Sequence, residues 1–389
     1  FPDEVFTNSG LTGRQMQAKA KNMLYDWFVT FRKEGFTEWN SSPYLPIDTL
    51  GFGSLYAFAQ DPAMRELGRE GMDFAYYLLA VHSQQGIFAS SSGRTYIKEQ
   101  FGNWSNCPSG LSWIGYGYGV PGHAGKGITS YCLSDYEPPK EFAQWFSIPQ
   151  GKEMICQTTQ GNDGYVDLYT YKTADYMMTS ANDFHPGEPG HQENPFQLTF
   201  NAVAQLWVTH PGERVLFGAA RPSYWAGNGT LPKVNQYKAF AGLIYDIAPE
   251  HPVDFTHLYL PSMEFDRCEV EGKWAFVQLG SAYAAVYCSN GMRMQDFGSN
   301  KDRECIAEGR RCIWLVRAAQ ADEFAAFEDF KAAMRGAALD ADAEGRRYHF
   351  VDPVYGELRC QWGETLYVND APMQYSGFDN YGKLTMQEK

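Results

Sequence analysis

The sequence lacks the features that would place the protein in a membrane or on nucleic acid. No apolar stretch approaches the roughly 20 residues that a helix needs to cross a bilayer, so we expect no membrane span. No basic run exceeds two residues, and the net charge of −14 repels a phosphate backbone. Nucleic acid is therefore not an expected partner, and an anionic ligand would need local arginine or lysine.

Several familiar chemical motifs are also missing. The sequence contains no HExxH or CxxC spacing, no GxSxG elbow, and no phosphate-loop or dinucleotide fingerprint. Because CxxC pairs are absent, we interpret most of the eight cysteines as reduced, structural thiols. The compartment stays open. A leader removed ahead of Phe1 would make the protein secreted or periplasmic, whereas reduced cysteines are typical of the cytoplasm.

The apolar pattern changes near residue 140, which predicts two parts in an α+β chain. Residues 14–34 carry apolar side chains at three- and four-residue spacing, Gly35 ends this helix, and Asp61-Pro62 opens another. Asp48 is a candidate cap for the helix between them. After Pro139 the pattern turns to period two, and many short strands with turn residues predict an antiparallel β-sandwich. We therefore expect a helical part at 1–140 and a β part at 141–389.

Candidate site residues fall into three groups. The first is the loop that holds Asn40 and Tyr44, where nearby cations could lower the tyrosine pKa and make it a base. A ring that only packs is the alternative. The second is Arg94 and Tyr96, where the guanidinium could grip a carboxylate or simply lie on the surface.

The third group lies in the β part. His191, Glu193, His210 and Arg221 follow one another along predicted strands, and His191 could transfer a proton, bind a metal or be structural. Glu193 stands two residues after His191, a spacing compatible with neighbouring ligands of a structural divalent metal.

Two of these segments resemble motifs of heparinase II/III-like polysaccharide lyases. The stretch Glu38-Trp39-Asn40-Ser41-Ser42-Pro43-Tyr44 resembles that family's catalytic-tyrosine loop, and His191-Gln192-Glu193 followed by His210-Pro211-Gly212 resembles its β-domain motif. Glutamate and histidine replace the aspartates that the family often has at Glu193 and His210. The resemblance implies helices of an α/α toroid followed by a large β-sandwich domain.

The resemblance also implies an activity, which is β-elimination on a uronic-acid-containing glycan without a required cofactor. Tyr44 would be the base and His191 the partner acid or base. The sugar-binding residues would be Asn40, Arg94, Tyr96, His210, Arg221 and Trp225. The family's first toroid helices would precede Phe1, so an N-terminal segment or a second chain is expected to complete the ring, unless Asn40 or Arg94 substitutes for the missing carboxylate-neutralising group.

Two other functions remain open at this point. A glycoside hydrolase on a helical toroid would use two carboxylates, for which Glu38 and Glu193 are candidates. A non-catalytic glycan-binding protein would instead use the aromatic segment from Trp104 to Tyr118 to stack sugar rings.

Overall fold

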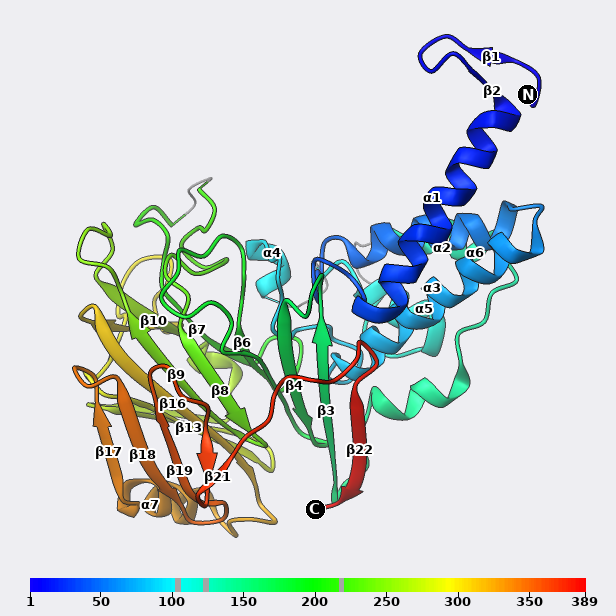
Figure 1. The fold of residues 1–389 in the computed structure, drawn as a ribbon. Coiled ribbons are helices and arrows are strands. Elements are labelled where there is room, and N and C mark those ends of the chain that lie inside the picture. Colours follow the sequence, from blue (N-terminus) through cyan, green and yellow to red (C-terminus); the bar gives the residue numbers. More distant parts are fainter. Residues whose placement is uncertain (102–105, 122–125, 217–219) are drawn as a thin grey trace.

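The computed structural model describes residues 1–101, 106–121, 126–216 and 220–389. It is an α+β chain in which all helices except α7 lie in the N-terminal part, and its sheets are antiparallel (Figure 1). The helices are α1 (Gly13–Glu34), α2 (Leu45–Phe58), α3 (Pro62–Val81), α4 (Ile97–Gln100), α5 (Ser109–Tyr116), α6 (Ile128–Cys132) and α7 (Phe327–Gly336), with 3-10 turns η1 (Lys140–Trp145) and η2 (Ser262–Glu264). The predicted α+β class is confirmed.

The helix ends follow the local sequence in most places. Thr12 and Gln15 form a capping box at the start of α1, and Gly35 ends the helix with a φ of 70°. Asp61 accepts a hydrogen bond from the Ala63 N–H and so caps α3. The expected cap at Asp48 is wrong, because α2 begins earlier and Asp48 lies in its first turn.

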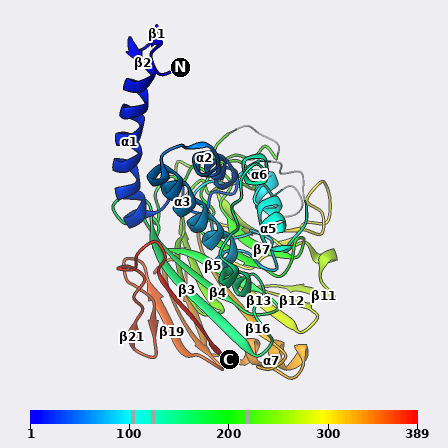
Figure 2. The ribbon, with the colours of Figure 1, turned by 90° about the vertical axis from the view of Figure 1, so that its right-hand side faces the viewer.

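The longest sheet has nine strands in the order β14-β15-β10-β7-β6-β5-β4-β3-β22. Its strands are β3 (Lys152–Gln160), β4 (Val166–Lys172), β5 (Met177–Asn182), β6 (Phe196–Thr199), β7 (Gln205–Thr209), β10 (Phe255–Tyr259), β14 (Arg293–Met294), β15 (Glu304–Glu308) and β22 (Lys383–Glu388). Strand β22 at the C-terminus pairs with β3, the first strand of this sheet along the chain (Figure 2).

Two smaller sheets follow. The six-stranded sheet has the order β11-β12-β13-β16-β9-β8, and the five-stranded sheet runs from β17 to β21. Their bounds are β8 (Lys233–Tyr237), β9 (Phe240–Asp246), β11 (Arg267–Glu271), β12 (Trp274–Leu279), β13 (Ala282–Cys288), β16 (Arg311–Gln320), β17 (Leu339–Asp342), β18 (Arg347–Asp352), β19 (Gly356–Gln361), β20 (Tyr367–Val368) and β21 (Ala371–Pro372). A short hairpin of β1 (Val5–Phe6) and β2 (Leu11–Thr12), not expected from the sequence, precedes α1.

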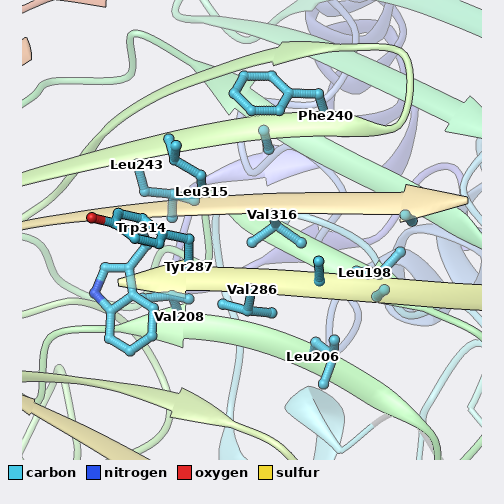
Figure 3. Packing of buried hydrophobic residues seen from close by; sticks show 14 of the residues in the cluster. Leu198, Leu206, Val208, Phe240, Leu243, Val286, Tyr287, Trp314, Leu315 and Val316 are labelled. Atoms are coloured by element: carbon cyan, nitrogen blue, oxygen red, sulfur yellow. The ribbon is translucent and has the colours of Figure 1, made fainter. Parts of the chain in front are cut away.

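Apolar residues of the nine- and six-stranded sheets form one large core. Figure 3 shows Leu198, Leu206 and Val208 of the longer sheet among side chains of β9, β13 and β16. A second core joins α1, α2 and α3 to β3, where Met154 and Cys156 lie against the helices. The helical part is therefore packed on one end of the nine-stranded sheet.

A buried lysine links these two parts. Lys172 Nζ on β4 donates to the carbonyl of Ala80 at 2.9 Å and to that of Trp145 at 2.7 Å. Burial lowers the pKa of Lys172 to about 7. Since both acceptors are carbonyl groups at the ends of α3 and η1, Lys172 fixes these helical ends over the sheet.

No helix among the described residues is both long and apolar enough to cross a membrane. All eight cysteines are free, as expected from their spacing.

Candidate functional site

Three segments far apart in the sequence meet beside the start of α2. Ser92 and Asn194 exchange two backbone hydrogen bonds, and the Gly93 N–H donates to the Trp39 carbonyl at 2.9 Å. The Thr95 N–H donates to the Gln192 carbonyl, and the Gln192 side chain donates back to the Thr95 carbonyl. These bonds hold the loop before α2, residues 91–96 and residues 191–194 as one unit.

The buried side of this unit keeps the tyrosine loop in place. Trp39 is buried and packs edge-on against Phe184 of the β part, with ring centroids 5.4 Å apart. Asn40 adopts a φ of 46°, a left-handed conformation that asparagine tolerates better than most residues. Its amide donates to the Ser91 carbonyl at 3.3 Å. Asn40 is thus buried beneath the site, and its expected contact with sugar is not provided by the structure.

Three adjoining cavities lie over this unit, and together we call them the cleft. The tyrosine cavity of about 380 Å³ is lined by Trp27, Thr30, Phe31, Gly35, Phe36, Thr37, Glu38, Tyr44, Asp48 and Asn162. The central cavity of about 280 Å³ is lined by Thr37, Glu38, Trp39, Gly93, Arg94, Asn162, Tyr165, His191, Gln192 and Glu193. The arginine cavity of about 500 Å³ is lined by Thr95, Tyr96, Ile97, Lys98, Gln192, Leu216, Ala220, Arg221, Ser223 and Ala226.

Shared walls connect the three cavities. Glu38 lines both the tyrosine cavity and the central cavity, and Gln192 lines both the central cavity and the arginine cavity. Tyr44 and His191, which we expected on one cleft, therefore line neighbouring cavities on either side of Glu38.

Tyr44 and Tyr96 lie together under two guanidinium groups. The Arg94 guanidinium is 5.3 Å from the Tyr44 ring centroid, and that of Arg221 is 5.3 Å from the Tyr96 ring centroid. Partial burial acts to raise the pKa of Tyr96, but the neighbouring Arg94, Arg221 and Tyr44 outweigh it and lower that pKa. A tyrosine with a lowered pKa is a better proton acceptor near neutral pH.

The two arginines have different environments. Arg94 Nε and Nη2 contact Glu38 Oε1 at 2.8 and 2.7 Å, and Arg94 Nη1 donates to Gln192 Oε1 at 2.7 Å. All three nitrogens of Arg94 therefore contact protein groups in this arrangement, so a substrate carboxylate would have to share or replace Glu38 or Gln192 as partner. Arg221 is exposed and forms no ion pair with any carboxylate in the described part of the chain. It is the cation of the cleft best able to receive an anion.

His191 is exposed and lines the central cavity. Its backbone N–H donates a hydrogen bond to Glu193 Oε2 at 2.5 Å. The residues that the structure describes contain no group of three or more His, Cys, Asp or Glu side chains that could hold a metal ion. The Glu193 carboxylate is thus engaged by local backbone next to His191.

Two residues expected to touch sugar lie inside the β part instead. His210 is buried, its Nε2 lies 3.1 Å from the Val253 carbonyl, and burial followed by the charge of His251 lowers its pKa to about 3. Trp225 is buried as well and stacks on His257 at a centroid distance of 4.0 Å. A glycan on the surface cannot reach these side chains, which corrects the prediction for both. Trp104, the first residue of the aromatic segment considered above, lies outside the described residues.

The structure also adds a site residue that sequence reasoning took for a helix cap. Asp48 lines the tyrosine cavity, where burial and then the charge of Glu38 raise its pKa to about 7. The signal in the sequence was weak, because an acidic residue in the first turn of a helix is common for electrostatic reasons alone.

Replacing Asp48 with asparagine should stabilise the protein above neutral pH. The folded-state pKa of Asp48 is raised, so its favourable contribution is complete below the ordinary aspartate pKa of 3.8 and is lost as the pH rises through about 7. We expect Asp48→Asn to increase the free energy of unfolding by about 1 to 3 kcal/mol at pH 8 and by almost nothing near pH 4.

Thermal and urea unfolding at both pH values measure this difference. Asp296→Asn, at an exposed carboxylate between β14 and β15, is the matched control and should leave the free energy of unfolding nearly unchanged at both pH values. Equal effects of Asp48→Asn at the two pH values would mean that Asp48 is ionised in the folded protein throughout.

Comparisons with known proteins add no assignment: no protein-family model matches the chain, and a search of curated proteins finds no significant match.

Proposed function

We propose that this chain is a polysaccharide lyase that cleaves a uronic-acid-containing glycan by β-elimination. The observation that carries the proposal is the pair Tyr44 and Tyr96, whose rings lie beneath the guanidinium groups of Arg94 and Arg221. Proton abstraction next to a carboxylate needs a base and a cation that neutralises the acid, and the cleft offers both.

In the proposed reaction, Tyr44 removes the proton from C5 of the uronate. Tyr44 enters this step as a phenolate, because a tyrosine that keeps its hydroxyl hydrogen cannot accept the C5 proton. The Arg94 guanidinium, 5.3 Å from its ring centroid, faces that negative charge. The electron pair left at C5 forms the C4–C5 double bond, the bond from C4 to the glycosidic oxygen breaks, and that oxygen takes up a proton.

The remaining groups of the cleft bind charge or supply that proton. Arg221 pairs with the uronate carboxylate and stabilises the negative charge that develops as the C5 proton leaves. His191, which lines the central cavity with Glu38, would protonate the leaving oxygen or share that role with Tyr44. Arg94, held by Glu38 and Gln192, positions the tyrosines. No step requires a cofactor.

The fold supports the same proposal at a coarser level. We assign α1, α2 and α3 to an incomplete α/α toroid, and the nine- and six-stranded sheets with their common core to the β-sandwich that follows it. The cleft would then lie where the toroid meets the sandwich. A further helical segment or a second chain would complete the toroid.

A glycoside hydrolase is the second candidate, and one observation favours it. Asp48 has a pKa of about 7 beside Glu38 in the tyrosine cavity, and hydrolases pair a protonated acid with an ionised carboxylate. Glu193, the other carboxylate considered for this role, lines the central cavity with Glu38. The lyase proposal is preferred because the cation Arg221 and the tyrosine pair have no part in a two-carboxylate mechanism.

The experiment that tests the proposed function is an activity screen on a panel of polyuronates and of glycans that alternate uronate with another sugar. A lyase leaves a C4–C5 double bond that absorbs ultraviolet light, so absorbance should rise on at least one substrate. Release of reducing ends without this absorbance would support the hydrolase, and binding without any cleavage would support a glycan-binding protein.

A further inference from the structure

The N-terminal two-thirds of α1 projects away from the rest of the chain (Figures 1 and 2). Only Phe28 and Phe31, near its C-terminal end, are buried. By contrast, Met16, Met23 and Trp27 have 39%, 61% and 44% of their surface exposed. Large apolar side chains gathered on one unpartnered helix are typical of an interaction surface.

These exposed residues form a regular seam. Met16, Ala20, Met23 and Trp27 follow one another at spacings of four, three and four residues, which places them on a single stripe of the helix. This alternation is the pattern of core positions in a coiled coil. With 3.6 residues per turn, this stripe lies about a quarter turn around the helix axis from the face that carries Phe28 and Phe31. The seam is thus available while α1 remains packed on its own chain.

We propose that the seam binds the same helix of a second copy of this chain, in antiparallel orientation. In the symmetric register, Met16 lies opposite Trp27 of the partner copy and Ala20 lies opposite Met23 of the partner copy. Each small or slender side chain then faces a large one, which allows close packing of two helices.

Charges beside the seam fit the same register. Lys19 and Asp26 lie on one flank of the seam, seven residues apart, and neither forms an ion pair within the described residues. In the antiparallel pair, Lys19 lies near Asp26 of the partner copy, and the twofold symmetry produces this contact twice. A second copy of α1 has side chains of the size and charge that match this seam. For that reason we favour a second copy over an unrelated helix as the partner.

A groove at the C-terminal end of the seam has room for the partner's side chain. It has a volume of about 750 Å³ and is lined by Leu24, Trp27, Phe28, Ile47, Asp48, Gly51, Phe52, Ser54, Leu55, Phe58 and Ala59. In the proposed register, Met16 of the partner copy enters this groove beside Trp27. Trp27 also lines the tyrosine cavity, so the dimer would bring the partner's helix to the edge of the cleft.

Sedimentation velocity of the full chain tests the dimer. Because the seam is short, we expect a weak dimer that dissociates on dilution below about 100 µM. Met23→Glu should raise the dissociation constant at least tenfold. Val29→Glu is the matched control, since Val29 is 67% exposed but lies on the opposite side of α1, and it should leave the constant unchanged. Unchanged circular dichroism and melting temperature would show that both variants fold.

Charge reversal tests the register. Lys19→Glu and Asp26→Lys should each weaken the dimer by placing like charges together, and the double variant Lys19→Glu/Asp26→Lys should restore it. A wild-type chain that stays monomeric at every concentration would overturn the proposal. So would a dimer that is indifferent to Met23→Glu, or one in which the double variant is as weak as the single variants.

Discussion

Tyr44→Phe should remove almost all β-elimination activity while leaving the fold and glycan binding intact. The variant loses only the hydroxyl that exchanges the proton, and the ring beneath Arg94 stays in place. Loss of a general base lowers the rate by a factor of about 10² to 10⁴. Initial rates of ultraviolet absorbance gain on the best substrate of the panel measure the effect.

Tyr25→Phe is the matched control for this variant. Tyr25 and Tyr44 are equally exposed, at 37%, but Tyr25 lies on α1 and lines none of the three cavities of the cleft. It should therefore keep the wild-type rate. A near wild-type rate for Tyr44→Phe with unchanged melting temperature would remove Tyr44 from the mechanism.

Arg221→Gln is expected to have the second largest effect. Removing a preorganised group that stabilises developing negative charge lowers the rate by a factor of about 10² to 10³. The same change removes one of the positive charges that lower the pKa of Tyr96. The pKa of Tyr96 should therefore be higher in the variant. The limb of kcat/KM that follows the ionisation of Tyr96 should move to higher pH.

The control is Arg214→Gln, which changes an exposed arginine paired with Asp254 outside the cleft. Its rate and its pH profile should match those of the wild-type chain. If Arg221→Gln lowers the rate without moving the pH profile, Arg221 binds substrate but does not act on the tyrosine pair.

Local sequence was sufficient to predict the long N-terminal helices. The spacing of apolar residues indicated α1, and the pair Asp61-Pro62 indicated the start of α3. These features depend on neighbours within one or two turns, so the sequence carries the information directly.

The site could be predicted only in part, because its contacts join distant residues. Arg94 contacts Glu38 and Gln192, which lie 56 and 98 residues away from it in the sequence. No local sequence pattern predicts such contacts. Trp225 and His210 look like exposed functional residues in the sequence, yet tertiary packing buries both. The tyrosine pair was missed for the same reason, since Tyr44 and Tyr96 meet only after the loops have been joined by backbone hydrogen bonds.

Cleavage in water enriched in heavy oxygen is the most direct test of the central claim. Elimination breaks the bond between C4 and the glycosidic oxygen without adding water, so mass spectrometry should find unsaturated products that carry no heavy oxygen at the new chain end formed in the cleavage step. Products that are heavier by one water and labelled with heavy oxygen at the new reducing end would contradict the lyase proposal and establish hydrolysis.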